Sequence, residues 1–410
     1  VGYQFEHRFD DVWSFRQNFR YMHVDGDLNQ VLPLAMLDDR TMERYALQVH
    51  DNLDAVTLDN QVQANFATGP LRHKLLMGLD FQNTTLDESQ GQALAPDLDI
   101  FAPVYYQAIP IPPTVSDTHQ RTYQVGLYAQ DQIRLGRLAL MLGGREDWAG
   151  TTTDDRVAQS SASQFDRKFT YRAGAVYLFD NGLAPYASYT TSFQPQIGTE
   201  ASGSAFKPTT GQQVEVGMKY QPPGYNSFVT LSAYQLTQQN VPTADPNNPA
   251  FQVQTGEVRT RGVEVEAHAN LLPGFNIIAS YGYADPVVTK STSGNLGKVP
   301  VNVPRQLASL WSDYTVQNGK LTGLGLGGGV RFVGTTFGDT ANTLRVPSYA
   351  LFDAALTYDF AGVSPRLKGW RLAVNASNLF DKQYVSECSN TAYCLYGLRR
   401  TVLANLRFRW

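Results

Sequence analysis

Apolar and polar residues alternate most clearly between residues 256 and 286, GEVRTRGVEVEAHANLLPGFNIIASYGYADP. Successive side chains of an extended strand point to opposite faces, so this pattern predicts a strand with one apolar and one polar face. Its apolar face is Val263, Val265, Ala267, Ala269 and Leu271, and its polar face is Glu264, Glu266, His268 and Asn270. Leu272-Pro273-Gly274 then reverses the chain, because proline fixes φ and glycine tolerates positive φ. A second strand returns with Phe275, Ile277, Ala279, Tyr281 and Tyr283 on its apolar face.

These strands are longer than the five or six residues or so that are usual in soluble proteins. They match the roughly nine to eleven residues that a tilted strand needs to cross a membrane. The same unit recurs along the chain, and about seventeen strands are expected. They run at about residues 1–10, 14–27, 53–68, 71–88, 121–135, 137–154, 169–180, 183–195, 207–221, 226–241, 256–271, 275–288, 304–316, 321–337, 349–360, 369–379 and 398–410.

The connections between these strands alternate between tight and long. The tight ones are Gly69-Pro70, Gly136, Asn181-Gly182, Gln221 to Tyr225 and Gln317 to Lys320. Asn181-Gly182 is the strongest hairpin signal, because both positions of a type I′ turn need positive φ. The long connections are Leu28 to Asn52, Ser89 to Gln120, Pro242 to Thr255 and Asp381 to Gly397. Short turns on one side and long loops on the other are typical of outer-membrane barrels, with the long loops outside the cell.

The last strand predicts the direction of the chain. Its apolar face is Val402, Ala404, Leu406, Phe408 and Trp410, so the chain ends on an aromatic residue of the lipid face. Bacterial barrels typically end on such an aromatic residue, with the C-terminus at the periplasmic rim. The connection before the last strand then lies at the opposite rim, which places Cys388 and Cys394 outside the cell. Seventeen is an odd count, whereas a closed antiparallel bacterial barrel has an even one. The first and last strands would run in the same direction, with Val1 at the extracellular rim.

Composition agrees with a barrel that places every second residue against lipid. The chain has 410 residues, of which 42% are hydrophobic and 17% are charged, below the roughly 25% charge of soluble domains. It has no run of about 18 apolar residues, which excludes a transmembrane helix on hydropathy. The 22 tyrosines and 21 phenylalanines suit aromatic girdles at the two membrane interfaces. A net charge of −4 argues against nucleic-acid binding. The chain begins at Val1 without methionine or signal peptide, so its start resembles a cut.

Few residues suggest bond chemistry. Gly323 to Gly328 matches the dinucleotide pattern GxGxxG, but no helical period follows it, so we expect strand. The six histidines show no metal-ligand spacing, and His268 is expected on the polar lumen wall. Glu215, Glu264, Glu266, Lys219, Arg407 and Arg409 are also expected to face the lumen. Such carboxylates could act in acid/base catalysis, but charges on a wet wall more simply bind water or a domain that fills the pore. No Ser-His-Asp set can be assembled, which leaves a protease or phospholipase as a lesser alternative.

Cysteines and loop aromatics are the remaining candidates. Cys388 and Cys394 are separated by five residues with no histidine nearby, which fits a small disulfide loop better than a metal site. Aromatics gather in the long loops, where they could bind a partly apolar organic ligand or pack within the loops. They are Phe101, Tyr105 and Tyr106 in FAPVYYQAIPIPP, and Tyr393 and Tyr396 on either side of Cys394.

Three motifs resemble those of TonB-dependent outer-membrane receptors: TRGVEVEA (260–267), NLFDKQYV (378–385) and the terminal LRFRW. Further stretches, among them YQVGLYAQDQ, FTYRAGAVYLFDNGLAPYASYTTSF and SECSNTAYCLYGLRR, resemble the ferric hydroxamate (ferrichrome-type) siderophore receptors over nearly the whole chain. In that family a 22-stranded barrel surrounds an N-terminal plug. The resemblance implies that residues 1–410 are the C-terminal portion of the barrel domain, with five strands, the plug and the TonB box absent. It also implies a Cys388–Cys394 disulfide, and a ligand position for Leu395 and Tyr396.

The expected protein is a monomeric outer-membrane receptor surrounded by lipid and lipopolysaccharide, and not an enzyme. It would take up a ferric siderophore, with energy supplied through the TonB complex, and would hold no covalent cofactor and no resident metal. The candidate ligand contacts are Phe101, Tyr105, Tyr106, Tyr393, Leu395 and Tyr396. One departure from the ferrichrome receptors is the stretch from Leu28 to Asn52, which lacks their tyrosines and cysteine pair and has Tyr45 as its only aromatic. A passive porin, or a receptor for another nutrient such as cobalamin, is the alternative.

Overall fold

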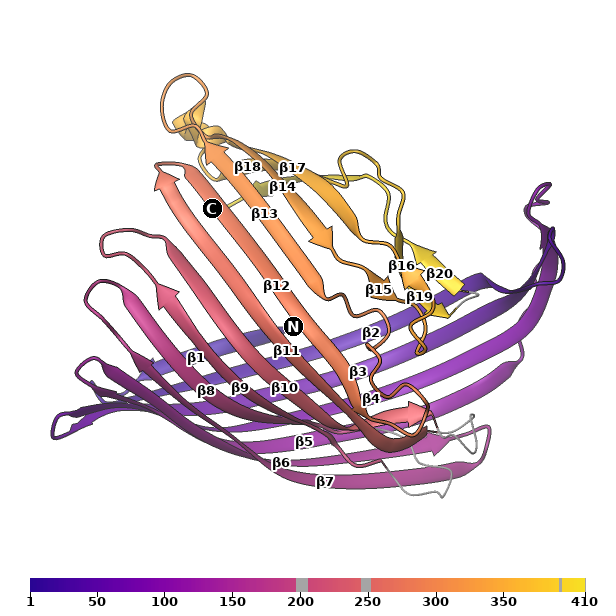
Figure 1. Cartoon of the computed structure of the whole chain (residues 1–410), viewed down its shortest axis with the longest axis horizontal. Coiled ribbons are helices and arrows are strands. Elements are labelled where there is room, and N and C mark those ends of the chain that lie inside the picture. Colours follow the sequence, from indigo (N-terminus) through magenta and orange to yellow (C-terminus); the bar gives the residue numbers. More distant parts are fainter. Residues whose placement is uncertain (197–205, 245–251, 391–392, 410) are drawn as a thin grey trace.

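The computed structural model describes residues 1–196, 206–244, 252–390 and 393–409. These residues form one curved antiparallel sheet of seventeen strands, each paired with its neighbours in chain order (Figure 1). Its first nine strands are β1 Gly2–Arg8, β2 Trp13–Met36, β3 Thr41–Thr68, β4 Leu71–Asp99, β5 Thr114–Leu135, β6 Leu138–Asp155, β7 Ser160–Tyr177, β8 Leu183–Gln194 and β9 Thr209–Tyr220. The other eight are β10 Phe228–Ala244, β11 Gln252–Leu272, β12 Phe275–Lys290, β13 Gln306–Thr315, β14 Leu324–Val333, β17 Tyr349–Asp359, β18 Trp370–Ser377 and β21 Thr401–Phe408. The predicted number of strands is therefore confirmed for the described residues.

The remaining elements are small and lie in the connections. The pairs β15 Thr336–Phe337 with β16 Arg345–Val346, and β19 Val385–Asn390 with β20 Tyr393–Tyr396, are two short hairpins. Two 3₁₀ turns, Phe360–Gly362 and Pro365–Leu367, join β17 to β18. None of the described helices is long and apolar enough to cross a membrane.

Strand register confirms the two faces predicted for the β11–β12 hairpin. Val263 lies opposite Tyr283, Val265 opposite Tyr281, and Ala267 opposite Ala279. Directly paired residues project to the same side of a sheet, so these apolar side chains form one surface. Glu264 and Glu266 project to the other side. Gly274 has a φ of 82°, as the predicted reversal requires.

The polar face is the concave one, as contacts across intervening strands show. The hydroxyl of Tyr128 on β5 donates to Oδ1 of Asp59 on β3 at 2.7 Å, past β4. Arg145 on β6 donates to Oδ1 of Asp80 on β4 at 3.0 Å, past β5. It crosses β5 at Gly126, where any Cβ would collide with its guanidinium. Side chains can meet across a whole strand only where the sheet curves toward them.

One turn differs from its prediction. A type I′ turn at Asn181-Gly182 would give both residues positive φ, but only Gly182 has it, at 88°. The amide of Gly182 donates to the carbonyl of Phe179 at 3.1 Å. This is the pattern of a three-residue hairpin, in which an ordinary turn is followed by one left-handed glycine.

The long connections also differ from prediction. Leu28 to Asn52 is not a loop: β2 and β3 continue through it, and only residues 37–40 lie outside strands. Ser89 to Gln120 shrinks to residues 100–113. In Figure 1 the hairpin of β2 and β3 projects beyond the ends of β8–β12. Within Asp381 to Gly397 the structure places the β19–β20 hairpin, whereas part of Pro242 to Thr255 and Trp410 lie outside the described residues.

Two further predictions are confirmed, the β-strand at the GxGxxG stretch and the common direction of the first and last strands. Gly323 is a turn residue with φ of 88°, and β14 follows it directly, so no helix opens at the glycines. The outermost strands of the described sheet are β1 and β21, and no described pairing joins them. With seventeen antiparallel strands they run in the same direction.

Candidate functional site

β2, β3 and β4 continue beyond the row of Tyr21, and this outer part of the three strands is called the extension below. In the extension the polar and apolar faces of the sheet are exchanged. Nearer the tight turns, the convex face is mainly apolar and reaches an aromatic rim at Tyr21, Phe81 and Tyr123. Beyond that rim the register continues without interruption, but the convex face becomes polar. Its residues are His23, Asp25, Asp27, His50, Asn52, Asp54, Asp87 and His119.

The concave face of the same extension becomes apolar. Val24 lies opposite Leu53, and Leu53 opposite Leu86, in one row across three strands. Leu28 lies opposite Val49 in the row four residues further out. This concave surface, formed by Val24, Leu28, Val49, Leu53 and Leu86, is called the aliphatic wall below. It stands above the polar lumen wall, at the end of the sheet that carries the long connections.

The loop of residues 100–113 joins β4 to β5 at this same end. Its sequence contains no charged residue. The predicted ligand residues Phe101 and Tyr105 are 74% and 70% exposed, and Tyr106 is fully exposed with a φ of 61°. The loop is anchored by Arg44, whose guanidinium donates to Oε1 of Gln107 at 3.1 Å. The structure thus presents three aromatic side chains to the outside.

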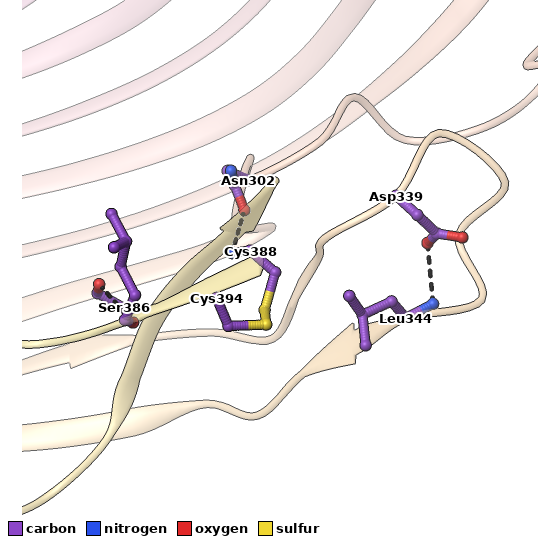
Figure 2. The surroundings of a disulfide bond; sticks show 7 residues. Asn302, Asp339, Leu344, Ser386, Cys388 and Cys394 are labelled. Atoms are coloured by element: carbon purple, nitrogen blue, oxygen red, sulfur yellow. Dashed lines mark hydrogen bonds between the residues drawn. A yellow bond between two sulfur atoms is a disulfide. The ribbon is translucent and has the colours of Figure 1, made fainter. Parts of the chain in front are cut away.

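The second group of predicted residues lies on the β19–β20 hairpin. Cys388 and Cys394 form the predicted disulfide, and they are direct partners in this hairpin. Cys388 is buried, and its amide donates to Oδ1 of Asn302 in a neighbouring connection at 3.3 Å (Figure 2). The disulfide therefore joins the two strands of the hairpin, and the buried Cys388 with its bond to Asn302 holds the hairpin against the adjoining connection.

Tyr396 is 79% exposed and Leu395 is 41% exposed at the end of this hairpin. The side chain of Tyr393 lies outside the described part of the chain. Among described residues no hydrogen bond or ring contact joins this hairpin to Phe101, Tyr105 and Tyr106. The two groups share one end of the sheet, because β4 and β18 run in the same direction.

The NLFDKQYV motif forms the anchor of that hairpin. Asn378 is buried with a φ of 50°, and its Nδ2 donates to the carbonyls of Lys382 at 2.9 Å and Leu398 at 3.1 Å. Asp381 accepts from the guanidinium of Arg399 at 2.8 Å and from the amide of Arg400 at 2.9 Å. The Arg399 guanidinium, with that amide, holds the pKa of Asp381 well below its ordinary value. The motif is thus a structural turn that positions Leu395 and Tyr396.

The carboxylates predicted for the lumen are there. Glu215, Glu264 and Glu266 line a cavity of about 370 Å³ on the concave face, together with Lys219. The hydroxyl of Tyr186 donates to Glu215 at 2.6 Å. His268 projects to this face, and Arg407 projects to it from β21. Arg409 lies just past the end of β21.

Sequence reasoning missed the histidine–aspartate pairs. On the convex face of the extension His23 contacts Asp54 at 3.0 Å, and His50 contacts Asp27 at 2.9 Å. The hydrogen bond that Asp27 accepts from the imidazole raises the pKa of His50. These partners lie on different strands and are brought together by register, which no spacing along the sequence reveals.

A further group missed by the sequence lies on the convex face near the Gly69-Pro70 turn. The hydroxyl of Thr68 is 2.7 Å from Nε2 of His73, whose Nδ1 is 2.7 Å from Oδ2 of Asp131. Phe66 stacks on the imidazole, with ring centroids 4.7 Å apart. The three groups are ordered like a hydrolase relay, but they tie a turn of β3–β4 to β5.

Residues 1–379 match the family described as TonB dependent receptor-like, beta-barrel, and the chain belongs to this family of Gram-negative outer-membrane barrels. It is 37% identical, over 100% of its length, to the "Ferrichrome outer membrane transporter/phage receptor" of Escherichia coli K12. It is 36% identical, over 99% of its length, to the "Ferrioxamine B receptor" of Salmonella typhimurium LT2.

The chain spans 58% and 57% of the length of these two relatives. The fold is similar to the crystal structure of the siderophore receptor PiuA from Acinetobacter baumannii, with a TM-score of 0.82 at 22% identity. That alignment covers 99% of this chain and 63% of the other.

Proposed function

We propose that residues 1–410 are the C-terminal portion of the barrel domain of an outer-membrane receptor that takes up a ferric siderophore of the hydroxamate type. The observation that carries the proposal is the similarity, along nearly the whole chain, to proteins whose names specify ferrichrome and ferrioxamine B. Both ligands are ferric hydroxamates. Uptake would involve no bond chemistry, with energy supplied through the TonB complex.

Support also comes from the mouth of the barrel. The aliphatic wall, the uncharged loop of residues 100–113 and the β19–β20 hairpin all lie at one end of the sheet. We propose that Phe101, Tyr105, Tyr106, Tyr393, Leu395 and Tyr396 contact the chelate there, since exposed aromatics can bind a partly apolar organic ligand. Such a ligand would pass from the loops to the polar lumen wall.

The test uses the intact receptor in its outer membrane. A strain that lacks it should lose growth on ferric hydroxamates under iron limitation, and the plasmid-borne gene should restore this growth. The purified receptor should quench its intrinsic fluorescence on titration with ferrichrome or ferrioxamine B but not with cobalamin. Binding of cobalamin alone would overturn the ligand class. Steady conductance in a planar bilayer without any chelate binding would favour a passive porin.

A further inference from the structure

A groove of about 520 Å³ lies on the convex face of β9 to β12, outside the barrel. One part of it is lined by the apolar row of Val216, Ala233, Val263 and Tyr283, which are direct cross-strand neighbours. Val263 and Tyr283 belong to the apolar surface of the β11–β12 hairpin. The groove therefore opens toward lipid rather than toward the lumen.

The next row outward on the same face is polar. Gln235 lies opposite Arg261 and Arg261 opposite Asp285, and all three residues line the groove. Arg261 stands eleven residues before Leu272, which precedes the tight turn. At about 3.3 Å per residue and a strand tilt of about 40°, Arg261 lies roughly 28 Å above that turn, whereas the apolar band of such barrels is about 25 Å tall. The polar row is thus at the outer boundary of the hydrocarbon layer.

The guanidinium of Arg261 has no carboxylate partner among the described residues. Its Nε donates to Oε1 of Gln235 at 2.8 Å, and no described acceptor lies within bonding distance of Nη1 and Nη2. Asp285 forms its ion pair with Arg305 instead, at 3.0 Å. Arg259, two residues further out on the same face of β11, also forms no described ion pair. Three arginines beside one aspartate leave an uncompensated positive charge at this boundary.

The groove combines hydrocarbon with a cation, and this combination defines the class of ligand. A free anion gains nothing from the apolar row, and an uncharged acyl chain alone leaves the guanidinium without an acceptor. Two neighbouring nitrogens of a guanidinium match two oxygens of a phosphate group. We propose that the groove binds a phosphate-bearing lipid of the outer leaflet, with its phosphate on Arg261 and an acyl chain along Val216, Val263 and Tyr283. This site is separate from the mouth of the barrel and does not depend on which ligand the receptor takes up.

The test counts the lipid molecules that the intact receptor retains in native mass spectrometry. The probes are diphosphorylated lipid A, its dephosphorylated form and inorganic phosphate alone. The wild-type receptor should hold at least one more molecule of lipid A than of the dephosphorylated form, with at least about tenfold higher affinity, as expected for hydrogen bonds to a charged group. Equal binding of the two forms would refute the phosphate contact. Inorganic phosphate should not compete at equal concentration, and if it did, the site would bind free anions and not a lipid.

Three variants locate the site on the barrel surface. Arg261→Gln removes the charge and should lose one retained molecule of lipid A. Gln235→Glu keeps the arginine but neutralises it, and should lose the same molecule. Arg167→Gln is the matched control, because Arg167 lies on the same convex face but is already paired with Glu146 at 2.5 Å, so lipid A should be retained. Circular dichroism checks that each variant is folded. An unchanged lipid count in both Arg261→Gln and Gln235→Glu, or an equal loss in Arg167→Gln, would overturn the assignment.

Discussion

Replacing Asn378 by alanine removes the side chain that anchors the β19–β20 hairpin. Besides its two donated bonds, its Oδ1 accepts from the amide of Lys382 at 2.8 Å. Three such hydrogen bonds contribute about 1 kcal/mol each, or about 3 kcal/mol together. The φ of 50° adds about 1 kcal/mol for alanine, because a Cβ is strained in the left-handed region. We therefore expect a loss of about 4 kcal/mol for alanine and about 3 kcal/mol for glycine.

Hydrogen exchange of the intact protein in lipid measures this loss locally. Amides between residues 378 and 400 should exchange about a thousandfold faster in Asn378→Ala, since about 1.4 kcal/mol corresponds to a factor of ten. Amides of β9 to β11 should be unchanged. Asn375→Ala is the matched control, because the side chain of Asn375 makes no described hydrogen bond. If glycine destabilised the hairpin as much as alanine, the strain argument would be wrong. If neither changed exchange, the anchor itself would be refuted.

Three further predictions concern the faces, the disulfide and the ion pair. Leu231→Arg places a charge on the lipid face of β10 and should cost about 2 kcal/mol in an unfolding titration in vesicles, whereas Thr230→Arg faces Glu266 in the lumen and should cost little. Reduction of Cys388–Cys394 should destabilise its hairpin by about 2 kcal/mol, seen as proteolysis confined to residues 385–396. Because the pKa of Asp381 is lowered in the folded state, its bond to Arg399 should stabilise the hairpin at neutral pH and disappear as acid protonates it, below about pH 4. Limited proteolysis measures this, and Asp381→Asn should make the hairpin as sensitive to protease at pH 7 as the wild type is in acid. If the protease resistance of the wild type fell already at pH 6, protonation of Asp381 would not be the cause.

The fold could be predicted from the sequence where each face of the sheet is in contact with a single environment, lipid on one side and water on the other. Between Val263 and Tyr283 lipid lies on one side and water on the other, so the period of two is also a period in polarity. The prediction failed from Leu28 to Asn52, because water replaces lipid on the convex face while the concave face becomes apolar. The alternation persists there with the two faces exchanged, so the polar residues of this stretch predict a loop although the backbone remains a strand.

The site could be predicted only in its local parts. Cys388 and Cys394 are close in sequence, and Phe101, Tyr105 and Tyr106 are conspicuous within an uncharged loop. The pairing of Val24 with Leu53 depends on the register of two long strands, and composition carries no information on register. The same holds for His73 and Asp131, which are 58 residues apart in the chain.

The inversion of polarity within β3 also restricts how the length of this chain can change. Phe66 faces lipid and Leu53 faces the mouth, from opposite sides of one uninterrupted strand. A single inserted residue between them would turn one half of the strand against the other, so that either an apolar side chain enters the lumen or Asp54 turns toward the mouth. Two inserted residues would restore both faces and raise the extension by about 7 Å. Insertions and deletions tolerated in β2 to β4 should therefore come in even numbers, whereas the loop of residues 100–113 can change by any number.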